Sequence, residues 1–596
     1  MKQKINLSIL ISLIAGLLFN ACTNAFDAIN TNPDRTTTAE PEYIFGLTTV
    51  AAFRAISGNL TVGDVNGPNW YIFGNYGNQW SVVGGTGPHF GADSHSDGIW
   101  NTLYTGAILP CNNIVRDYGD NPAYTNRVAI AKIWRSYCFS QLVGLYGPCP
   151  YTNAANGESS TPYDKEETIY RGILQELKDA YTSLDPKGDT YPTAAEPFLA
   201  SDINRWSQFA HCIRLRTAAR LTEVPDQWAS GLANDAKAIV VEELNNAENG
   251  QLITNNSGNF YMAFGSDQTA NQNPVYREVV ANPQLANLDP GQFPVIHESL
   301  VLWMGPNSYN DPCLNVYMTA GSGGTRAHPL PPYLGRPHSM DMPQNYHSQP
   351  GWSSPYNGLK YADFATIGKM FSGMIANFYF FSYPELCFLR SEAVLKGYWG
   401  GSKTAEQYYY DGIEARCSKY GVSGTAVANY ENSPGIHWST PSDTTKNPTA
   451  FRDYLGGIIN SYLGGEEDNF KRIIVQHWIS LFSQNIDIYT LLRRTEVIPF
   501  KPHFGSDPTS ANVTSTYAFM PERLIYPGNE LNINTKETQY AISNYLLDNT
   551  LNQQPDQVSF RLIYAKDNPG LPAPEDGSIA YAAYPFPLPN MAKNRQ

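Results

Sequence analysis

One loop of the chain combines aromatic rings with side-chain amides. Between residues 69 and 80 it carries Trp70, Asn75, Tyr76, Gln79 and Trp80, interleaved with glycines. Aromatic faces stack on the apolar C–H face of a sugar ring, and amides hydrogen-bond sugar hydroxyl groups. These residue types therefore predict a carbohydrate-binding surface. The alternative is that the same rings pin a long loop onto the body of the protein.

A second irregular stretch, residues 250–360, is dense in Asn, Pro, Gly and Ser. It contains further aromatic residues, among them Trp303, Tyr333 and Trp352. Long ordered loops on a regular scaffold are where binding residues usually lie. We therefore expect these three rings to form a wall opposite the first loop.

Four metal-ligating side chains lie close together just before Trp100. His89, Asp93, His95 and Asp97 are imidazole and carboxylate groups that would suit a divalent ion. The loop is glycine-rich, however, and no helix fixes the geometry of these groups. We expect no metal site here, and we expect Asp97 to cap a helix that starts near Trp100. No cofactor is predicted, and the sequence does not decide whether Ca²⁺ binds elsewhere.

A catalytic role finds no support in the sequence, which contains no GxSxG, HExxH, GxxxxGK[ST] or GxGxxG motif. A glycosidase needs two carboxyl groups about 5–9 Å apart, a distance that a sequence cannot give. Glu385 and Glu392 lie in a helical pattern, where we expect them to make polar contacts between packed helices. Arg493 and Arg494 are expected to form ion pairs between helices. We therefore predict no catalytic residue.

The N-terminus has the layout of a secretory signal peptide over residues 1–21. Lys2 and Lys4 precede an apolar run at residues 5–19, and the small Ala21 is followed directly by Cys22. The Ala–Cys junction resembles a bacterial lipobox, although the two residues before it depart from the usual pattern. We expect the Cys22 thiol to be acylated and to anchor the protein in a membrane. Ordinary secretion is the alternative.

The charge balance excludes some partners. The chain has 54 acidic and 40 basic residues, and removing the two lysines of the signal peptide changes the formal net charge from −14 to −16. An acidic protein without a basic run is not expected to bind nucleic acid. Apart from Cys22, the chain has seven cysteines, an odd number at scattered positions with no CxxC motif, which predicts mostly free thiols.

Apolar residues recur at helical spacing over much of the chain, whereas alternating strand patterns are few. Helices are expected at residues 43–56, 99–118, 126–146, 164–184, 203–222, 383–393, 405–420 and 470–492. The predicted fold is mainly α, built from tetratricopeptide-like helix pairs with long loop insertions and few short strands. We divide the mature chain into an N-terminal helical part (22–249), a loop-rich insertion (250–360) and a C-terminal helical part (361–596). The two helical parts are expected to pack into one body.

Seven groups of residues resemble, in order, the conserved strings of the SusD/RagB family, in its SusD-like branch. They lie at residues 29–34, 100–115, 146–170, 205–216, 383–393 (YPELCFLRSEA), 473–495 and 521–532. Each string is weak alone, but seven in sequence order are a specific signal. The chain departs from the pattern at Ser391, where the family has Ala, and at His477, where it has Lys.

The resemblance implies a SusD-like fold and a place on the outer face of the outer membrane of Bacteroidota. There the protein would act as a lid over a SusC-type TonB-dependent barrel and capture oligosaccharides for import. Oligopeptides are an alternative ligand class, while a secreted glycoside hydrolase or a protein-binding scaffold are alternatives of another kind. Ligand residues cannot be transferred from the family, because its binding loops vary.

Overall fold

The structure is a computed structural model. It describes residues 39–57, 74, 77–81, 94–154, 160–266, 272–273, 276, 295–306, 309–321, 332–335, 364–433, 435–439, 451–452, 458–459, 469–495, 497, 522–547 and 560–566. The predicted signal peptide and Cys22 lie outside these residues, so both stay predictions. Within the described ranges, no helix combines the length and the apolar character that crossing a membrane requires.

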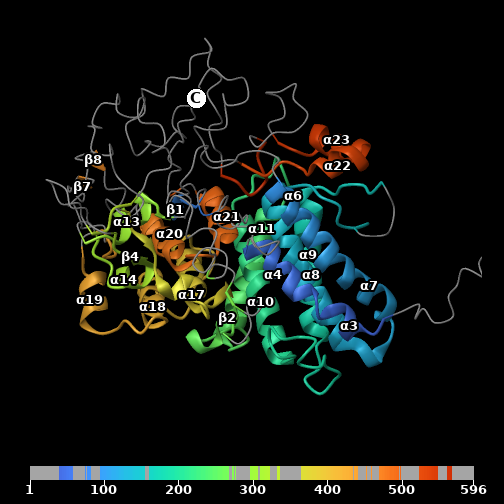
Figure 1. Cartoon of the computed structure of the whole chain (residues 1–596), viewed down its shortest axis with the longest axis horizontal. Helices are drawn as coiled ribbons and strands as arrows, with labels where there is room; N and C mark the ends of the chain where they lie inside the picture. The colour runs from blue at the N-terminus through green and yellow to red at the C-terminus, as the bar shows by residue number, and fades with distance from the viewer. Residues whose placement is uncertain are drawn as a thin grey trace, which may run out of the picture.

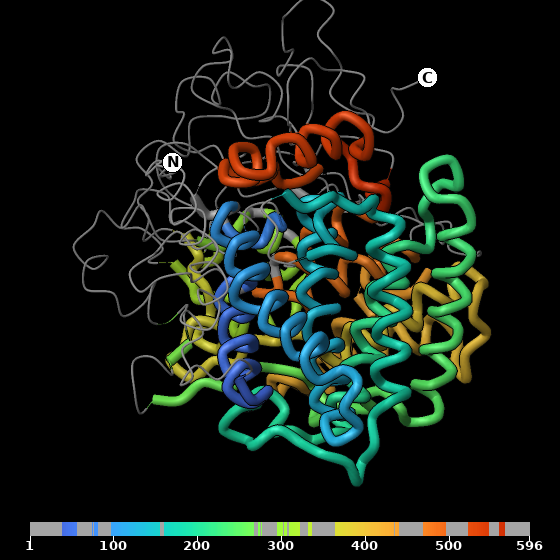
Figure 2. The backbone as a smooth tube through the Cα atoms, turned by 90° about the vertical axis from the view of Figure 1, so that its right-hand side faces the viewer, coloured from blue at the N-terminus to red at the C-terminus, as the bar shows by residue number. Residues whose placement is uncertain are grey.

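The N-terminal half consists of helices that stand side by side (Figure 2). They are α3 (Pro41–Phe45), α4 (Thr48–Ser57), α6 (Ser94–Leu103), the π-helix η2 (Tyr104–Ile108), α7 (Leu109–Tyr118), η3 (Pro122–Tyr124), α8 (Thr125–Tyr146), α9 (Glu166–Ser183), α10 (Ile203–Leu221) and α11 (Leu232–Glu248). Helix α9 packs against both α8 and α10, and α10 packs in turn against α11. Consecutive helices therefore form the expected pairs.

The C-terminal half adds further helices around a second closely packed pair, α17 (Tyr383–Leu395) and α18 (Ala405–Ser418). The others are η4 (Asn256–Gly258), α13 (Glu298–Met304), α14 (Leu314–Tyr317), α16 (Lys369–Ser372), α19 (Thr425–Glu431), α20 (Asn469–Ser480), α21 (Asn485–Thr495), α22 (Gly528–Ile533) and α23 (Thr535–Asn544). The fold is mainly α, with tetratricopeptide-like helix pairs, as predicted.

The strands are short and few, which was also expected. They are β1 (Trp80–Ser81), β2 (Phe260–Met262), β3 (Val295–Ile296), β4 (Met318–Thr319), β5 (Thr366–Ile367), β6 (Phe378–Phe381), β7 (Phe451–Arg452) and β8 (Ile458–Ile459). One sheet has the order β1-β3-β5-β4, while β2 pairs with β6 and β7 with β8. We call the four-stranded sheet the loop sheet, because its strands come from the two irregular stretches and the residues that follow them. It lies with α13 and α14 on the opposite side of the molecule from α7 (Figure 1).

Local signals explain where several helices begin. The Asp202 side chain caps α10 by accepting hydrogen bonds from the backbone N–H groups of Asn204 and Arg205. Thr404 and Gln407 form a reciprocal capping box at the start of α18. Pro384 occupies the first turn of α17, where its missing N–H costs no helical hydrogen bond.

Three local predictions were wrong. The helix expected over residues 470–492 is two helices, because Ser483 adopts a left-handed φ of 73° that ends the first one. The helix expected from residue 164 begins at Glu166, and the Asp164 carboxylate does not cap it but accepts the backbone N–H groups of Tyr151 and Thr152. Asp97 lies inside the first turn of α6, which begins at Ser94, and so is not its N-cap.

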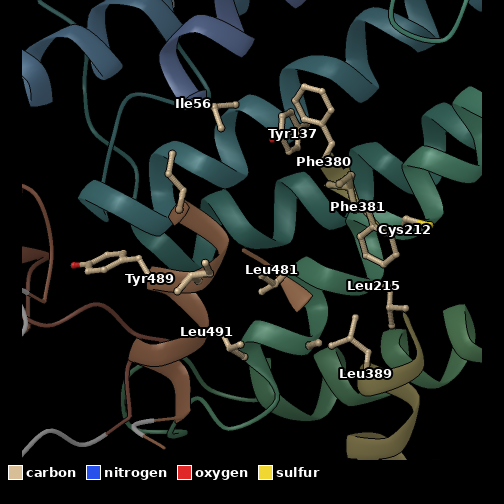
Figure 3. Close-up of a cluster of buried hydrophobic side chains, with 14 of the residues drawn as sticks. Ile56, Tyr137, Cys212, Leu215, Phe380, Phe381, Leu389, Leu481, Tyr489 and Leu491 are labelled. Atoms are coloured by element: carbon tan, nitrogen blue, oxygen red, sulfur yellow. The ribbon is translucent and has the colours of Figure 1, made fainter. Parts of the chain in front are cut away.

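The high aromatic content fills the space between the helices. Trp134 of α8 packs against Trp206 and Phe380, with ring centroids 6.1 and 5.9 Å away. Tyr137, one turn further along α8, lies 5.7 Å from Phe380, and the two rings are neighbours in the core (Figure 3). Edge-to-face rings at these distances pack favourably. The seven cysteines other than Cys22 are buried free thiols, as predicted.

Buried ion pairs join helices that are far apart in sequence. Arg216 of α10 donates to both oxygens of Glu385 at 2.6 Å and to Asp487 at 3.1 Å. Arg494 pairs with Glu392, and Arg493 pairs with Glu522 at 2.7 Å. The expectation is confirmed for Glu385, Glu392 and Arg494, whose ion pairs link helices. Arg493 instead pairs with Glu522, which lies outside any helix.

Candidate ligand-binding region

The loop sheet joins the two irregular stretches that the sequence singles out. Trp80 of β1 pairs with Ile296 of β3, and Val295 pairs with Thr366 of β5. The backbone N–H of His297 also donates to the Gln79 carbonyl at 2.9 Å. The first aromatic loop and the 250–360 stretch therefore meet at one place, as an opposing-wall arrangement requires.

Gln79 and Trp80 anchor the first loop to the helical body. Both side chains are fully buried. The Gln79 amide donates to the Trp478 carbonyl at 2.9 Å, and the Trp478 indole N–H donates back to the Gly77 carbonyl at 2.7 Å. The Trp80 ring packs edge-on against Phe482, with centroids 5.7 Å apart. Neither side chain offers a ligand any surface in this arrangement, so the loop-pinning alternative describes these two residues.

The two described aromatic residues predicted to bind ligand in the 250–360 stretch differ in how deeply they are buried. Trp303 is 5% exposed and stacks on Tyr309 at 4.9 Å, so its ring belongs to the core. Tyr333 is half-buried, and its hydroxyl donates to the Asn315 side-chain oxygen. Of the predicted ligand residues that the structure describes, Tyr333 alone is not fully buried. No sequence motif around Asn315 indicates that it is the hydrogen-bond partner of Tyr333.

The remaining predicted ligand residues are Trp70, Asn75, Tyr76 and Trp352, which lie outside the described residues. Trp70, Asn75 and Tyr76 precede β1 in sequence, and Trp352 precedes β5. Each of these residues is therefore followed along the chain by a strand of the loop sheet. Their roles stay predictions.

A buried ion pair stabilises the base of this region. Arg416 of α18 donates to Asp311 at 2.7 Å, and both side chains are almost fully buried. The Arg416 guanidinium also lies 5.9 Å from the ring centroid of Tyr317, which in turn packs against Phe371. The turn before α14 is thus fixed to a long helix, and the loop sheet has a rigid support.

The described residues do not support a metal site in the loop before Trp100. Among them, no three His, Cys, Asp or Glu side chains are arranged to hold an ion. His89 and Asp93 lie outside the described residues, and Asp97 is half-buried in α6. A metal site in that loop is therefore not proposed.

A cleft of about 630 Å³ with both polar and apolar walls lies in a different place, between η4, α18 and α19. Its lining includes Asp411, Glu414 and Glu431, together with Asn255 and side-chain hydroxyl groups. Burial, and then the nearby Glu414 carboxylate, raise the pKa of Glu431 to about 7. The cleft can accept hydrogen bonds from hydroxyl or ammonium groups. Sequence reasoning missed it, because its residues are spread over separate elements without a motif.

Comparison with known proteins identifies the architecture. A family model described as "Starch-binding associating with outer membrane" (SusD-like) matches residues 90–527. A SusD homologue from Bacteroides uniformis superimposes with a TM-score of 0.67 at 20% identity, covering 88% of this chain and 99% of that one. One from Bacteroides thetaiotaomicron gives a TM-score of 0.65 at 20% identity over 89% and 100% of the two chains. No curated protein matches the sequence.

A third solved structure is described as a chitin-binding SusD homologue from Flavobacterium johnsoniae. It gives a TM-score of 0.66 at 18% identity and covers 88% of this chain and 99% of that one. At these identities the structural matches establish the fold, while the family model establishes descent over most of the chain. The chain therefore belongs to the SusD-like family.

Proposed function

We propose that this protein binds carbohydrate at the outer membrane through the loops mounted on the loop sheet. The observation that carries the proposal is the pairing of β1 with β3, which brings the two aromatic, amide-rich stretches to one place. The family description as starch-binding supports it, as do structural relatives described as chitin-binding. An aromatic and amide surface suits the two chemically different faces of a sugar.

Within this region we assign two roles. Trp70, Asn75, Tyr76, Tyr333 and Trp352 contact the ligand. Gln79, Trp80 and Trp303 hold the loops in place, because their side chains are buried.

Calorimetric titration with malto-oligosaccharides and chito-oligosaccharides tests this division. Trp70→Ala and Tyr76→Ala are expected to weaken binding at least tenfold, about 1.4 kcal/mol, without changing the melting temperature. Tyr43→Ala is the control, because Tyr43 is an aromatic residue that is 78% exposed on the helical body. Binding that survives both loop substitutions would contradict the assignment.

We further propose that Cys22 is lipidated and that the protein is held at the cell surface as the lid of a SusC-type TonB-dependent barrel, importing oligosaccharides. The N-terminal layout and the family description support this location. A lid that shares its ligand with a barrel needs only modest affinity for that ligand in solution, because closure of the lid raises the effective concentration of the ligand at the barrel. Oligopeptides remain the alternative cargo.

Co-purification from the native outer membrane in mild detergent tests the partnership. We expect a TonB-dependent barrel in near-stoichiometric amount, and mass spectrometry of any trapped ligand separates glycan from peptide. A Cys22→Ala variant should be released from the membrane. A protein that comes down without a barrel would contradict the lid proposal while leaving carbohydrate binding to be judged by titration.

We propose that the protein acts by binding and not by catalysis, and that it needs no cofactor. Incubation of the purified protein with the same oligosaccharides should leave their lengths unchanged. Binding should also persist after treatment with a chelator. Chain cleavage by the pure protein would establish the hydrolase alternative.

A further inference from the structure

A small cavity lies where α10, α17, α20 and α21 meet in the centre of the molecule. Its volume is about 30 Å³, and its walls include Arg216, Arg220, Glu385, His477, Asp487 and Arg494. Each of these side chains is at least nine-tenths buried. Apolar walls come from Leu389, Leu481 and Leu491, which surround the same space (Figure 3). A cavity this deep with this many charged groups requires an account of every polar atom.

The arginines are satisfied by protein groups. Arg216 is shared between Glu385 and Asp487, and Arg494 pairs with Glu392. Arg220 donates to the Ser140 carbonyl at 3.0 Å and to the Thr490 hydroxyl at 3.3 Å. The positive groups of the cavity therefore do not call for an additional anion.

His477 and Asp487 are not satisfied in this way. Neither ring nitrogen of His477 hydrogen-bonds to a described residue, and the same holds for the Oδ1 atom of Asp487. Burial, and then the nearby Arg494 and Arg216, lower the pKa of His477 well below its usual value, so the ring is neutral. A neutral imidazole has one N–H donor and one acceptor nitrogen. The residues that line the cavity thus include one donor and two acceptors without a described partner.

Only certain ligands match this set. An anion accepts hydrogen bonds but cannot donate to the Asp487 oxygen or to the acceptor nitrogen of His477. A bare cation would lie beside three guanidinium groups and would leave the His477 N–H unpaired. Water donates twice and accepts twice, so it can satisfy all three atoms. Leaving such atoms unpaired would destabilise the folded protein.

The size of the cavity agrees with the same ligand. A water molecule needs roughly 10–15 Å³ of space measured in this way, so a cavity of about 30 Å³ accommodates two. We propose that this cavity is a hydration site in which two ordered water molecules bridge the His477 ring to the Asp487 carboxylate. The site links α20 to α21, and it does not depend on the proposed carbohydrate function.

A crystal structure at high resolution, grown in sodium bromide, tests the proposal directly. We expect two peaks in the cavity without anomalous signal, each within hydrogen-bond distance of His477 or Asp487. In His477→Phe, which keeps the ring that stacks on Phe388, at least one peak should disappear. In His477→Lys the ammonium group should displace water and contact Asp487. His437→Phe, at an exposed histidine, should leave both peaks unchanged.

An empty cavity in the wild-type crystal would overturn the proposal. An anomalous bromide peak would overturn it as well, because the site would then bind an anion. Peaks that persist unchanged in His477→Phe would show that His477 does not hold the water.

Discussion

The helical body and the loop sheet are stabilised in different ways. In the body, long helices such as α8 and α10 bury most of their side chains and are joined by buried ion pairs. The strands of the loop sheet are only two residues long, too short to hold a register by backbone hydrogen bonds alone. Buried side chains such as Trp80 and Tyr317 fix their positions instead.

Because of this difference, we expect the residues that stabilise the fold to be distinct from the residues that bind the ligand. A region whose strands depend on a few buried anchors can vary the residues between those anchors without unfolding the body. The anchors and the proposed ligand contacts can even be neighbours in sequence, as Gln79 and Trp80 are to Tyr76, whose contact with the ligand is a proposal. Substitutions in the two regions should therefore affect different measurements.

The largest effect is expected from Arg216→Met in the body. The substitution leaves Glu385 and Asp487 buried without their shared cation, which should lower the free energy of unfolding by about 3–5 kcal/mol. Chemical denaturation measures this. Arg116→Met is the control, because the Arg116 side chain is 64% exposed and its ion pair with Asp117 should contribute less than about 1 kcal/mol. If both variants lost the same free energy of unfolding, the buried and the exposed ion pairs would contribute equally, which would contradict this prediction.

Trp80→Ala comes next, and it tests the anchoring role. Removing a fully buried indole should cost about 3 kcal/mol of stability and should weaken carbohydrate binding as well, because the loop loses its support. Trp70→Ala should weaken binding only. Melting curves and titrations of both variants decide the matter. A Trp80→Ala protein of wild-type stability that no longer binds would place Trp80 at the ligand.

A smaller, pH-dependent effect is expected at Glu166 of α9. This buried carboxyl accepts the Ile563 backbone N–H at 3.2 Å, and burial raises its pKa to about 8. The folded state therefore holds a proton that the unfolded state releases above about pH 4.5, so stability falls as the pH rises from there to about 8.

Glu166→Gln keeps the acceptor and cannot ionise. The variant should match the wild type at pH 4 and exceed it by about 2 kcal/mol at pH 6. Urea denaturation at the two pH values measures the difference. A constant offset between the two proteins would show that Glu166 does not titrate in this range.

The smallest effect is expected from Thr404→Ala, which removes the capping box of α18. One helix cap contributes about 1 kcal/mol, so the melting temperature should fall slightly while binding stays unchanged. Thr425→Ala, at the first residue of α19 outside any capping hydrogen bond, serves as the comparison. A loss of binding in Thr404→Ala would mean that the body and the loop sheet are coupled.

Helical periodicity predicted most of the body, because long amphipathic stretches record which face is buried. It missed α11, where small side chains such as Ala233, Ala236 and Ala247 give a weak apolar signal. It also ran α20 and α21 together, because neither Gly nor Pro marks the left-handed turn at Ser483.

The candidate site was harder to predict for a physical reason. An aromatic ring beside amides is equally suited to a sugar and to a crowded core, and the residue type does not say which way the ring points. Trp80 and Trp303 are buried, whereas Tyr333 is only half-buried. The partners that decide this, Phe482 for Trp80 and Asn315 for Tyr333, come from other parts of the chain.

Hydrogen–deuterium exchange with and without a bound oligosaccharide tests the central claim most directly. Malto-oligosaccharides and chito-oligosaccharides are the ligands to use, at concentrations that saturate binding in titration. We predict slower exchange in residues 69–81, 295–321 and 332–335, with little change in α8 to α11. Protection confined to the helical body, or to the cleft between α18 and α19, would contradict the assignment of carbohydrate binding to the loop sheet.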